Sequence, residues 1–386
     1  MKKISYLLIV ILLLPGCTSV PLKETTAYND KTLYRRAPSK MEGNHRIIGL
    51  FYASSRQVRE QDGQLYFNSE MADSPTLGKL NCRIDPLVKI AKVTAAELKK
   101  KGIIRVQDVA RLNDDAFIRE LLQAVQSSPR KSLLVLVHGF KDDFELTATK
   151  LAYFTYLLDV NTPVLIFDWP GDQSVTPWGY RKAEKLAAAS GAQLGGVLTK
   201  VIREVKPEKL WIESSSLGCQ VVCSAFEWMY QQPDLADPEA EIALTVMAAP
   251  DVSKNEFNDK FRDEILALSE KLAVYVSSND KALLMARIID WEKKFGRQHS
   301  AVTEQEQFEE AHGFLSLKYL IPDRLSIVDV TPVNRASYGH QYDLQAPEFY
   351  DDFYMRLFDA SSHHNRQLYL VNVDKDIDYW IMRSDR

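Results

Sequence analysis

The chain of 386 residues has little cysteine, no excess of positive charge and no repeated or low-complexity segment. Its four cysteines fit an exported protein without the disulfide framework of a small secreted domain. A formal net charge of −4 gives no electrostatic case for nucleic-acid binding. The sequence shows neither a cluster of metal ligands nor a nucleotide-binding loop, and therefore implies no metal and no cofactor. What remains is a globular composition, 46% hydrophobic and 26% charged, that can bury a large core.

The apolar run at the N-terminus is too short to span a bilayer comfortably. Lys2 and Lys3 precede apolar residues 4–14, an arrangement that is typical of a secretory signal peptide. The run ends in Leu-Pro-Gly-Cys, which resembles the lipobox of bacterial lipoproteins. The resemblance implies a signal peptide over residues 1–16 and a lipid bilayer as partner through an acylated Cys17. An uncleaved N-terminal anchor is the alternative.

The residues that follow indicate where the protein is held. Thr18 stands where enteric lipoproteins of the inner membrane carry aspartate, which favours the outer membrane and a protein that faces the periplasm. Residues 17–44 are polar and contain turn formers, so we expect a tether with an end-to-end distance of about 30 Å. A single domain is expected from residue 45 to residue 386. The sequence does not predict an oligomeric state.

Strand and helix patterns alternate along most of this domain. Two short strands over 46–54 and 80–93 and helices over 94–101 and 114–127 are expected first. From Lys131 onward, apolar strands alternate with amphipathic helices, which predicts a doubly wound α/β fold with a mostly parallel sheet and helices on both faces. The predicted core strands lie within 132–140, 162–170, 210–215, 241–250, 271–279 and 324–331. Residues 281–323 are a candidate cap over a cleft.

The segment LWIESSSLG reads as a strand that turns sharply into a helix. It has the form of a nucleophile elbow, with Ser216 at the tip and Gly218 two residues later. Such a turn exposes the serine hydroxyl and directs the Leu217 N–H toward a reacting carbonyl. Three adjacent serines leave the register open, so Ser214 and Ser215 are alternatives to Ser216.

Ligands of an open parallel sheet bind at the carboxyl ends of its strands, and these ends carry an acid and a histidine. Asp280 follows the strand in which this fold usually places its acid, and His340 lies in the loop after the last core strand. Asp251 is the alternative acid, one strand earlier. The order serine, acid, histidine is that of the α/β-hydrolase triad. We therefore expect Ser216 as nucleophile, His340 as base and Asp280 as the acid that orients it.

A catalytic serine also requires donors for the oxyanion. The HGF turn at 138–140 would supply the Phe140 N–H beside that of Leu217. His138 more often supports such a loop by hydrogen bonding than it transfers protons.

The ordered motifs LLVLVHGFKDDFELTATKLA, VLIFDWPG, SSSLG, MAAPDV and YVSSNDKALLMAR resemble those of the DUF900 family of α/β hydrolases. The earlier FYASSRQV resembles the family's N-terminal segment, so the resemblance covers about residues 47–345. It implies the same roles for Ser216, Asp280 and His340, with Phe140 and Leu217 as oxyanion donors.

The chain departs from that family at the elbow. The family has AHSMG where this chain has SSSLG, and Glu213 takes a position that is normally apolar. These changes leave two functions open: an anchored serine hydrolase that cleaves a small acyl-containing ester, thioester or amide, or a catalytically inactive binding or scaffolding module of the envelope. Cys219 and Cys223 are expected as buried small hydrophobes. The pair at 363–364, His-His, is expected in a solvated loop.

Overall fold

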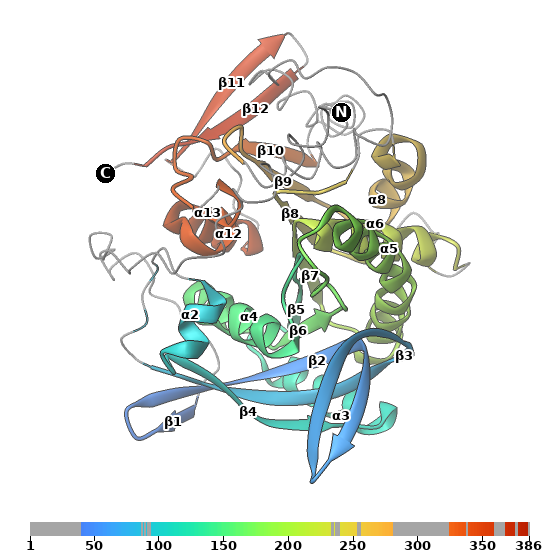
Figure 1. Cartoon of the computed structure of the whole chain (residues 1–386). Coiled ribbons are helices and arrows are strands. Elements are labelled where there is room, and N and C mark those ends of the chain that lie inside the picture. The colour runs from blue at the N-terminus through green and yellow to red at the C-terminus, as the bar shows by residue number, and fades with distance from the viewer. Residues whose placement is uncertain are drawn as a thin grey trace, which may run out of the picture.

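The computed structural model describes residues 40–85, 88, 90, 94–232, 235, 240–252, 256–280, 324–336, 339–358, 367–374 and 377–384. The strands of these residues form one 12-stranded sheet in the order β11-β12-β10-β9-β8-β7-β5-β6-β2-β3-β4, and β1 pairs with β2 (Figure 1). The predicted signal peptide, Cys17, the candidate cap over 281–323 and the histidine pair at 363–364 lie outside the described residues.

The centre of the sheet is parallel, as predicted. Its strands pair in parallel from β2 through β6, β5, β7, β8, β9 and β10 to β12. Every residue of β5 is buried, because helices cover both faces. The strands are β2 His45–Gln61, β5 Ser132–Val137, β6 Val164–Asp168, β7 Lys209–Ser215, β8 Leu244–Ala248, β9 Leu272–Val276, β10 Leu325–Asp329 and β12 Ile377–Met382.

Antiparallel strands extend the sheet at both edges. β2 and β3 (Gln64–Ile84) form a long hairpin whose outer part projects from the sheet (Figure 1). Its turn is Asp62–Gly63, and both residues have positive φ, which suits a two-residue hairpin turn. β4 (Ile104–Arg111) lies beyond β3, and β1 (Lys40–Glu42) pairs with β2. At the opposite edge, β11 (Leu368–Asp374) pairs antiparallel with β12.

Helices pack on the two faces of the sheet and enclose two apolar cores. Alternate residues of β5 supply both cores: Leu134 and Leu136 lie in one, and Leu133, Val135 and Val137 in the other. The first core contains α2 Ala95–Lys100, α4 Phe144–Leu158, α12 Tyr342–Gln345 and α13 Pro347–Leu357. The second contains α3 Asp114–Ser127, α5 Pro177–Lys200, η3 Val201–Val205, α6 Leu217–Tyr230, η4 Phe257–Phe261 and α8 Arg262–Leu268.

Local signals set where the helices that flank the site begin. The Asp143 side chain accepts a hydrogen bond from the Leu146 N–H and caps α4 directly after the loop that follows β5. Thr176 caps α5 in the same way, and Pro177 occupies its first turn, where a missing N–H costs nothing. Both caps fix the lengths of loops at the carboxyl edge of the sheet.

The predicted fold class is confirmed, and the N-terminal strand predictions are partly wrong. The strand predicted over 46–54 is the first half of a 17-residue strand. The strand predicted over 80–93 is instead the last part of β3, which ends at Ile84. β4 was not predicted, because its half-buried residues show no clear apolar run. β1 falls within the segment predicted as a tether.

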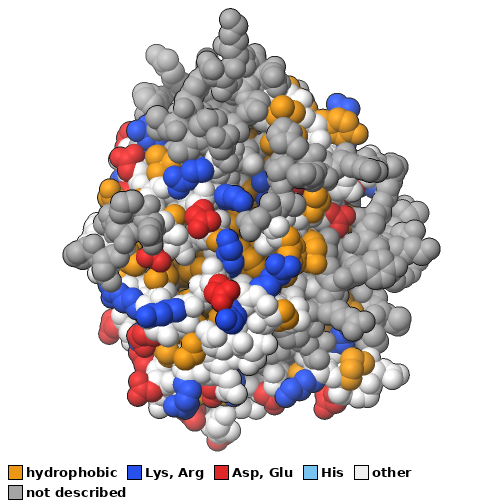
Figure 2. Space-filling model, turned by 180° about the vertical axis from the view of Figure 1, so that it is seen from behind, with side chains coloured by type: hydrophobic (Ala, Val, Ile, Leu, Met, Phe, Trp, Pro, Cys, Tyr) orange, Lys and Arg blue, Asp and Glu red, His pale blue; other side chains and the backbone are white. Residues whose placement is uncertain are grey.

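On the face shown in Figure 2, acidic and basic side chains are interspersed among apolar ones. Among the described helices, none is both long and apolar enough to cross a membrane.

Candidate active site

Ser216 is the single residue between the end of β7 and the start of α6. It has φ 53° and ψ −130°, a backbone conformation that costs a non-glycine residue about 1–3 kcal/mol. One hydrogen bond and one close approach of the backbone hold the turn in place. The Ser216 N–H donates to the Ala248 carbonyl at 3.0 Å, and a Cβ on Gly218 would lie 2.5 Å from the His138 carbonyl oxygen. The junction therefore has the geometry of a nucleophile elbow.

The geometry separates Ser216 from its two neighbours. Ser214 and Ser215 belong to β7, and the Ser214 hydroxyl donates to the Val246 carbonyl at 3.3 Å inside the sheet. The Ser216 hydroxyl makes no hydrogen bond within the described part of the chain. Of the three serines, Ser216 is the one that lies at the tip of the turn.

His340 and Asp280 are brought together from loops 60 residues apart. His340 Nδ1 lies 2.8 Å from Asp280 Oδ2, with the Asp280 side chain 2% exposed and the His340 side chain 22% exposed. β9 and β10, which lead into the two loops, are adjacent and parallel. Asn334 ties the loops together, because its Nδ2 donates to the Gly339 carbonyl at 2.6 Å and to Asn279 Oδ1 at 2.9 Å.

The surroundings of His340 stabilise its protonated form. Burial by itself would lower the pKa of the imidazole. The hydrogen bond and the charge of Asp280 outweigh burial, Asp343 and Asp251 add to them, and the pKa of His340 rises above 6.5. An imidazole that binds a proton in this way can act as a general base.

Asp251, the alternative acid, is bonded elsewhere. It accepts a hydrogen bond from the Tyr180 hydroxyl on α5, and its backbone N–H donates to the Ser216 carbonyl at 3.2 Å. It therefore braces the elbow, whereas Asp280 contacts the imidazole. The carboxylate of Asp251 still helps to raise the pKa of His340, which links the elbow and the His340 loop electrostatically.

The loop after β5 runs directly beside the elbow. A Cβ on Gly139 would lie 2.9 Å from Ser216 Cβ and 3.0 Å from the Ser215 carbonyl oxygen. The Phe140 N–H donates no hydrogen bond to a described residue. Leu217 is the first residue of α6, so its N–H has no acceptor within the helix. Two backbone donors are thus left beside the serine.

His138 supports this loop. Its imidazole is fully buried and stacks on Trp169, with ring centroids 5.5 Å apart. Its Nε2 lies 3.2 Å from the Trp169 backbone N and 3.4 Å from Asp168 Oδ1. Trp169 is the donor in both of its hydrogen bonds to His138, because its indole N–H also donates to the His138 carbonyl, at 2.7 Å. These contacts join the end of β5 to the end of β6.

The close approach at Gly139 gives a testable prediction. We expect Gly139→Ala to lower kcat at least about 10-fold, because the added methyl must displace the loop or the elbow. Gly196→Ala, inside α5 with nothing within 4 Å of the added methyl, is the matched control. It should leave activity unchanged and stabilise the protein by about 0.5–1 kcal/mol. Thermal unfolding and ester hydrolysis measured on both variants check this, and wild-type kcat in Gly139→Ala would contradict the loop placement.

Glu213 is buried beneath the elbow. Its side chain is 2% exposed, and its Oε1 has no hydrogen-bond partner among the described residues. Burial raises the pKa of Glu213 well above its ordinary value and the charge of Asp343 raises it further, whereas Lys150 lowers it. Lys150 is itself buried on α4, with its Nζ 3.6 Å from Asp142 Oδ2. Glu213 is therefore a core residue and not a surface one.

Three residues that shape the site were not predicted from the sequence. They are Asn334, which links the acid and histidine loops, Tyr180, which binds Asp251, and Arg56, which binds Asp168. Asn334 and Tyr180 carry no sequence signal that separates them from ordinary loop and helix residues. The one available signal was for Arg56: a charged residue that directly follows an apolar strand within a recognised motif.

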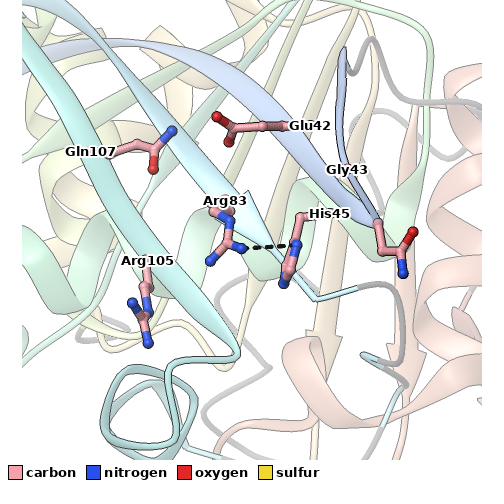
Figure 3. A pocket seen from close by; sticks show the side chains of 7 residues that line it. Glu42, Gly43, His45, Arg83, Arg105 and Gln107 are labelled. Carbon is pink, nitrogen blue, oxygen red and sulfur yellow. Dashed lines mark hydrogen bonds between the residues drawn. The ribbon is translucent and has the colours of Figure 1, made fainter.

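Other chemistry-bearing residues lie apart from the site. Cys82, Cys219 and Cys223 are buried and free, and no group that could hold a metal ion occurs among the described residues. An open hollow lies at the amino end of β2, where the Arg83 guanidinium donates to His45 Nδ1 at 2.9 Å (Figure 3). The site borders the other end of β2, so this hollow is not part of it.

Comparison with known proteins supports the fold. Residues 92–357 match the family model described as "Alpha/beta hydrolase of unknown function (DUF900)". None of the curated proteins matches the sequence.

Similar solved structures include enzymes with distant sequences. A PEG-bound cold-adapted esterase from an Arctic intertidal metagenomic library is 13% identical with TM-score 0.31, over 75% of this chain and 97% of that one. Esterases from Rhizomucor miehei are 10% identical with TM-score 0.34, over 86% of this chain and 85% of that one. An uncharacterised protein from Capnocytophaga ochracea is 10% identical with TM-score 0.32, over 73% of this chain and 60% of that one. Identities and TM-scores this low assign no activity.

Proposed function

The chain belongs to the DUF900 family of α/β hydrolases, and on that premise we propose that it is a serine hydrolase. Its substrate would be a small acyl-containing ester, thioester or amide, cleaved through an acyl-enzyme. The observation that carries the proposal is the 2.8 Å contact between His340 and Asp280 at the edge of the sheet where Ser216 forms the elbow. No cofactor is needed for this chemistry.

In the proposed reaction, Ser216 Oγ attacks the substrate carbonyl while His340 Nε2 takes the hydroxyl proton. Asp280 holds the opposite edge of the imidazole and stabilises its positive charge. The N–H groups of Phe140 and Leu217 bind the oxyanion of the tetrahedral intermediate. The leaving group departs with the proton from His340, and a water molecule, activated by the same imidazole, then releases the acyl group and regenerates Ser216.

The hydrogen bond between Ser216 and His340 must still form, either by a small movement of the site or when substrate binds. The Ser216 hydroxyl donates to no described acceptor, whereas the mechanism requires a bond to His340. Such bonds are often long in the absence of substrate and tighten when it binds. Gly339, beside His340, has positive φ, and a Cβ there would clash with the Asn279 carbonyl oxygen, so only glycine fits where the His340 loop meets the Asp280 loop.

The proposed location is the bacterial envelope. An acylated Cys17 would anchor the domain to the outer membrane, facing the periplasm, and the polar segment that follows would hold it off the bilayer. The sequence of residues 1–17 is the support for this part of the proposal. It concerns where the enzyme acts and does not select its substrate.

A catalytically inactive binding or scaffolding module is the competing function. It is favoured by one observation, the buried carboxyl of Glu213 in the strand that leads into the elbow. A buried carboxyl whose Oε1 has no hydrogen-bond partner among the described residues costs stability, and such costly residues are often retained for function.

Pre-steady-state hydrolysis of p-nitrophenyl acetate by the full-length protein in detergent decides between the two functions. An acyl-enzyme predicts a burst of p-nitrophenol equal to the concentration of sites, followed by slower turnover. Ser216→Ala should show neither phase. If wild type and Ser216→Ala hydrolyse this ester, a thioester and an amide at the same background rate, the protein is the inactive module.

A further inference from the structure

A buried arginine, Arg56, connects four segments at the edge of the site. Its side chain is fully buried where the β2–β3 hairpin leaves the sheet, between two shifts of strand register. Such irregularities often aim a side chain next to a site. Nε donates to both carboxylate oxygens of Asp168, at 3.0 and 2.9 Å, and Nη1 donates to Asp172 Oδ1 at 2.5 Å. Nη1 also donates to the Asn68 carbonyl of the hairpin at 3.3 Å.

The third nitrogen of the guanidinium, Nη2, hydrogen-bonds the loop that lies beside Ser216. Nη2 donates to the backbone carbonyls of Asp142 and Trp169, both at 2.8 Å. Asp142 is the last residue before the cap of α4 and lies two residues after Phe140. One hydrogen bond from Arg56 therefore fixes the far end of the loop.

The same ion pair reaches the near end of the loop through Asp168. That carboxylate lies 3.4 Å from His138 Nε2 and accepts a hydrogen bond from the Ser54 hydroxyl at 2.5 Å. Burial would raise the pKa of Asp168, but Arg56, His138 and Ser54 together hold it below its ordinary value. The loop from 138 to 142 is thus tied at both ends to one charged pair, with Phe140 between them.

Stability alone does not account for this arrangement. A fully buried ion pair contributes little net stability, since removing both charges from water offsets most of their attraction. Its geometry is specific, because a planar guanidinium can bind a carboxylate and two carbonyls at fixed angles. A lysine carries the same charge but cannot make these bonds at once.

We propose that Arg56 is a positioning residue that sets the backbone of residues 138–142 so that the Phe140 N–H meets the oxyanion. This inference rests on the proposed function and adds to it a residue outside the triad and the elbow. Arg56 touches no reacting atom. It acts through the Asp142 carbonyl and through Asp168, and its effect is therefore confined to the transition state, in which the oxyanion forms.

The test is the steady-state kinetics of Arg56→Lys, with Arg356→Lys as matched control. Arg356 is also buried and ion-paired, with its Nε 2.8 Å from Asp352 on α13, and it bonds Tyr275 instead of the loop. We expect Arg56→Lys to lower kcat about 10- to 100-fold with KM within about twofold of wild type. Affinity for phenylboronic acid, which forms a tetrahedral adduct with a catalytic serine, should fall in parallel. Arg356→Lys should keep wild-type kcat and boronate affinity even if its melting temperature falls equally.

The outcomes separate the inference from the proposed function. Wild-type kcat in folded Arg56→Lys, or a change in KM alone, overturns the role of Arg56 while the serine hydrolase stands. An inactive wild type overturns the proposed function first. If Arg56→Lys does not fold, Asp172→Ala, which removes one acceptor of Nη1 at a partly exposed position, carries the test. A lower kcat at unchanged KM then supports the role, and wild-type kcat overturns it.

Discussion

Ser216→Ala is expected to lower kcat for ester hydrolysis by about 10⁴- to 10⁶-fold, the range seen when a catalytic serine is removed from an enzyme. The triad acts as a unit, so His340 without the hydroxyl has nothing to activate. The variant should fold normally, because the Ser216 hydroxyl makes no hydrogen bond within the described residues. Initial rates with an activated ester and a thermal melt of the same sample check both statements.

Alanine variants of the neighbouring serines are the controls. Ser215→Ala should keep activity within about tenfold of wild type, since its side chain belongs to β7. Ser214→Ala loses the buried contacts of its hydroxyl with the Val246 carbonyl and with Cys219 Sγ, and should be less stable by about 1 kcal/mol while remaining active. If either variant is as inactive as Ser216→Ala and equally folded, the register of the elbow is wrong.

Asp280→Asn has the second largest expected effect, a loss of about 10⁴-fold in kcat. The amide would hold His340 in the tautomer that cannot accept the serine proton, and it would no longer stabilise the imidazolium. Asp251→Asn is the matched control, because it removes a carboxylate of the same size one strand away. It should cost less than about tenfold, since Asp251 binds Tyr180 and the elbow backbone instead of the imidazole. A reversed order of the two effects would make Asp251 the acid.

The pH dependence of kcat/KM should also identify Asp280 as the carboxylate that pairs with His340. Neutral His340 is the active form, so activity falls as pH drops through its pKa. Because the pKa of His340 is raised, the wild-type acid limb should lie above 6.5. Asp280→Asn removes the main raising influences, so the residual activity should persist to lower pH than in wild type. Asp251→Asn should shift the acid limb of the pH profile less. An acid limb that does not shift in Asp280→Asn would contradict the pairing of Asp280 with His340.

The core of the fold was predictable because parallel strands buried on both faces leave unbroken apolar runs. Their carboxyl ends lie at one edge, so the sequence could place Ser216, Asp280 and His340 at that edge before any distance was known. The sequence favoured Asp280 over Asp251 only by its position after the strand that usually carries the acid and by the family resemblance, whereas the contact with His340 came from the structure. That contact depends on the rotation of the His340 loop, which Asn334 sets through bonds across 55 residues.

The N-terminal hairpin was missed for a physical reason. Its outer part is polar and half exposed, and its length comes from pairing with its own partner and not from an apolar pattern. The Asp62–Gly63 pair is the sequence signal for this hairpin, because Asp-Gly suits a two-residue turn with positive φ. Arg56 was missed because a charged residue after an apolar strand is usually solvated, and its burial depends on acceptors from three other segments.

The most direct test of the account is to find the residue that forms the covalent adduct. Full-length protein would be reacted with a fluorophosphonate, digested and analysed by tandem mass spectrometry, with His340→Gln as the unreactive control. We expect one adduct, on Ser216, that is absent when the base is removed. An adduct on another residue, or no adduct on a folded protein that has measurable esterase activity, would contradict it.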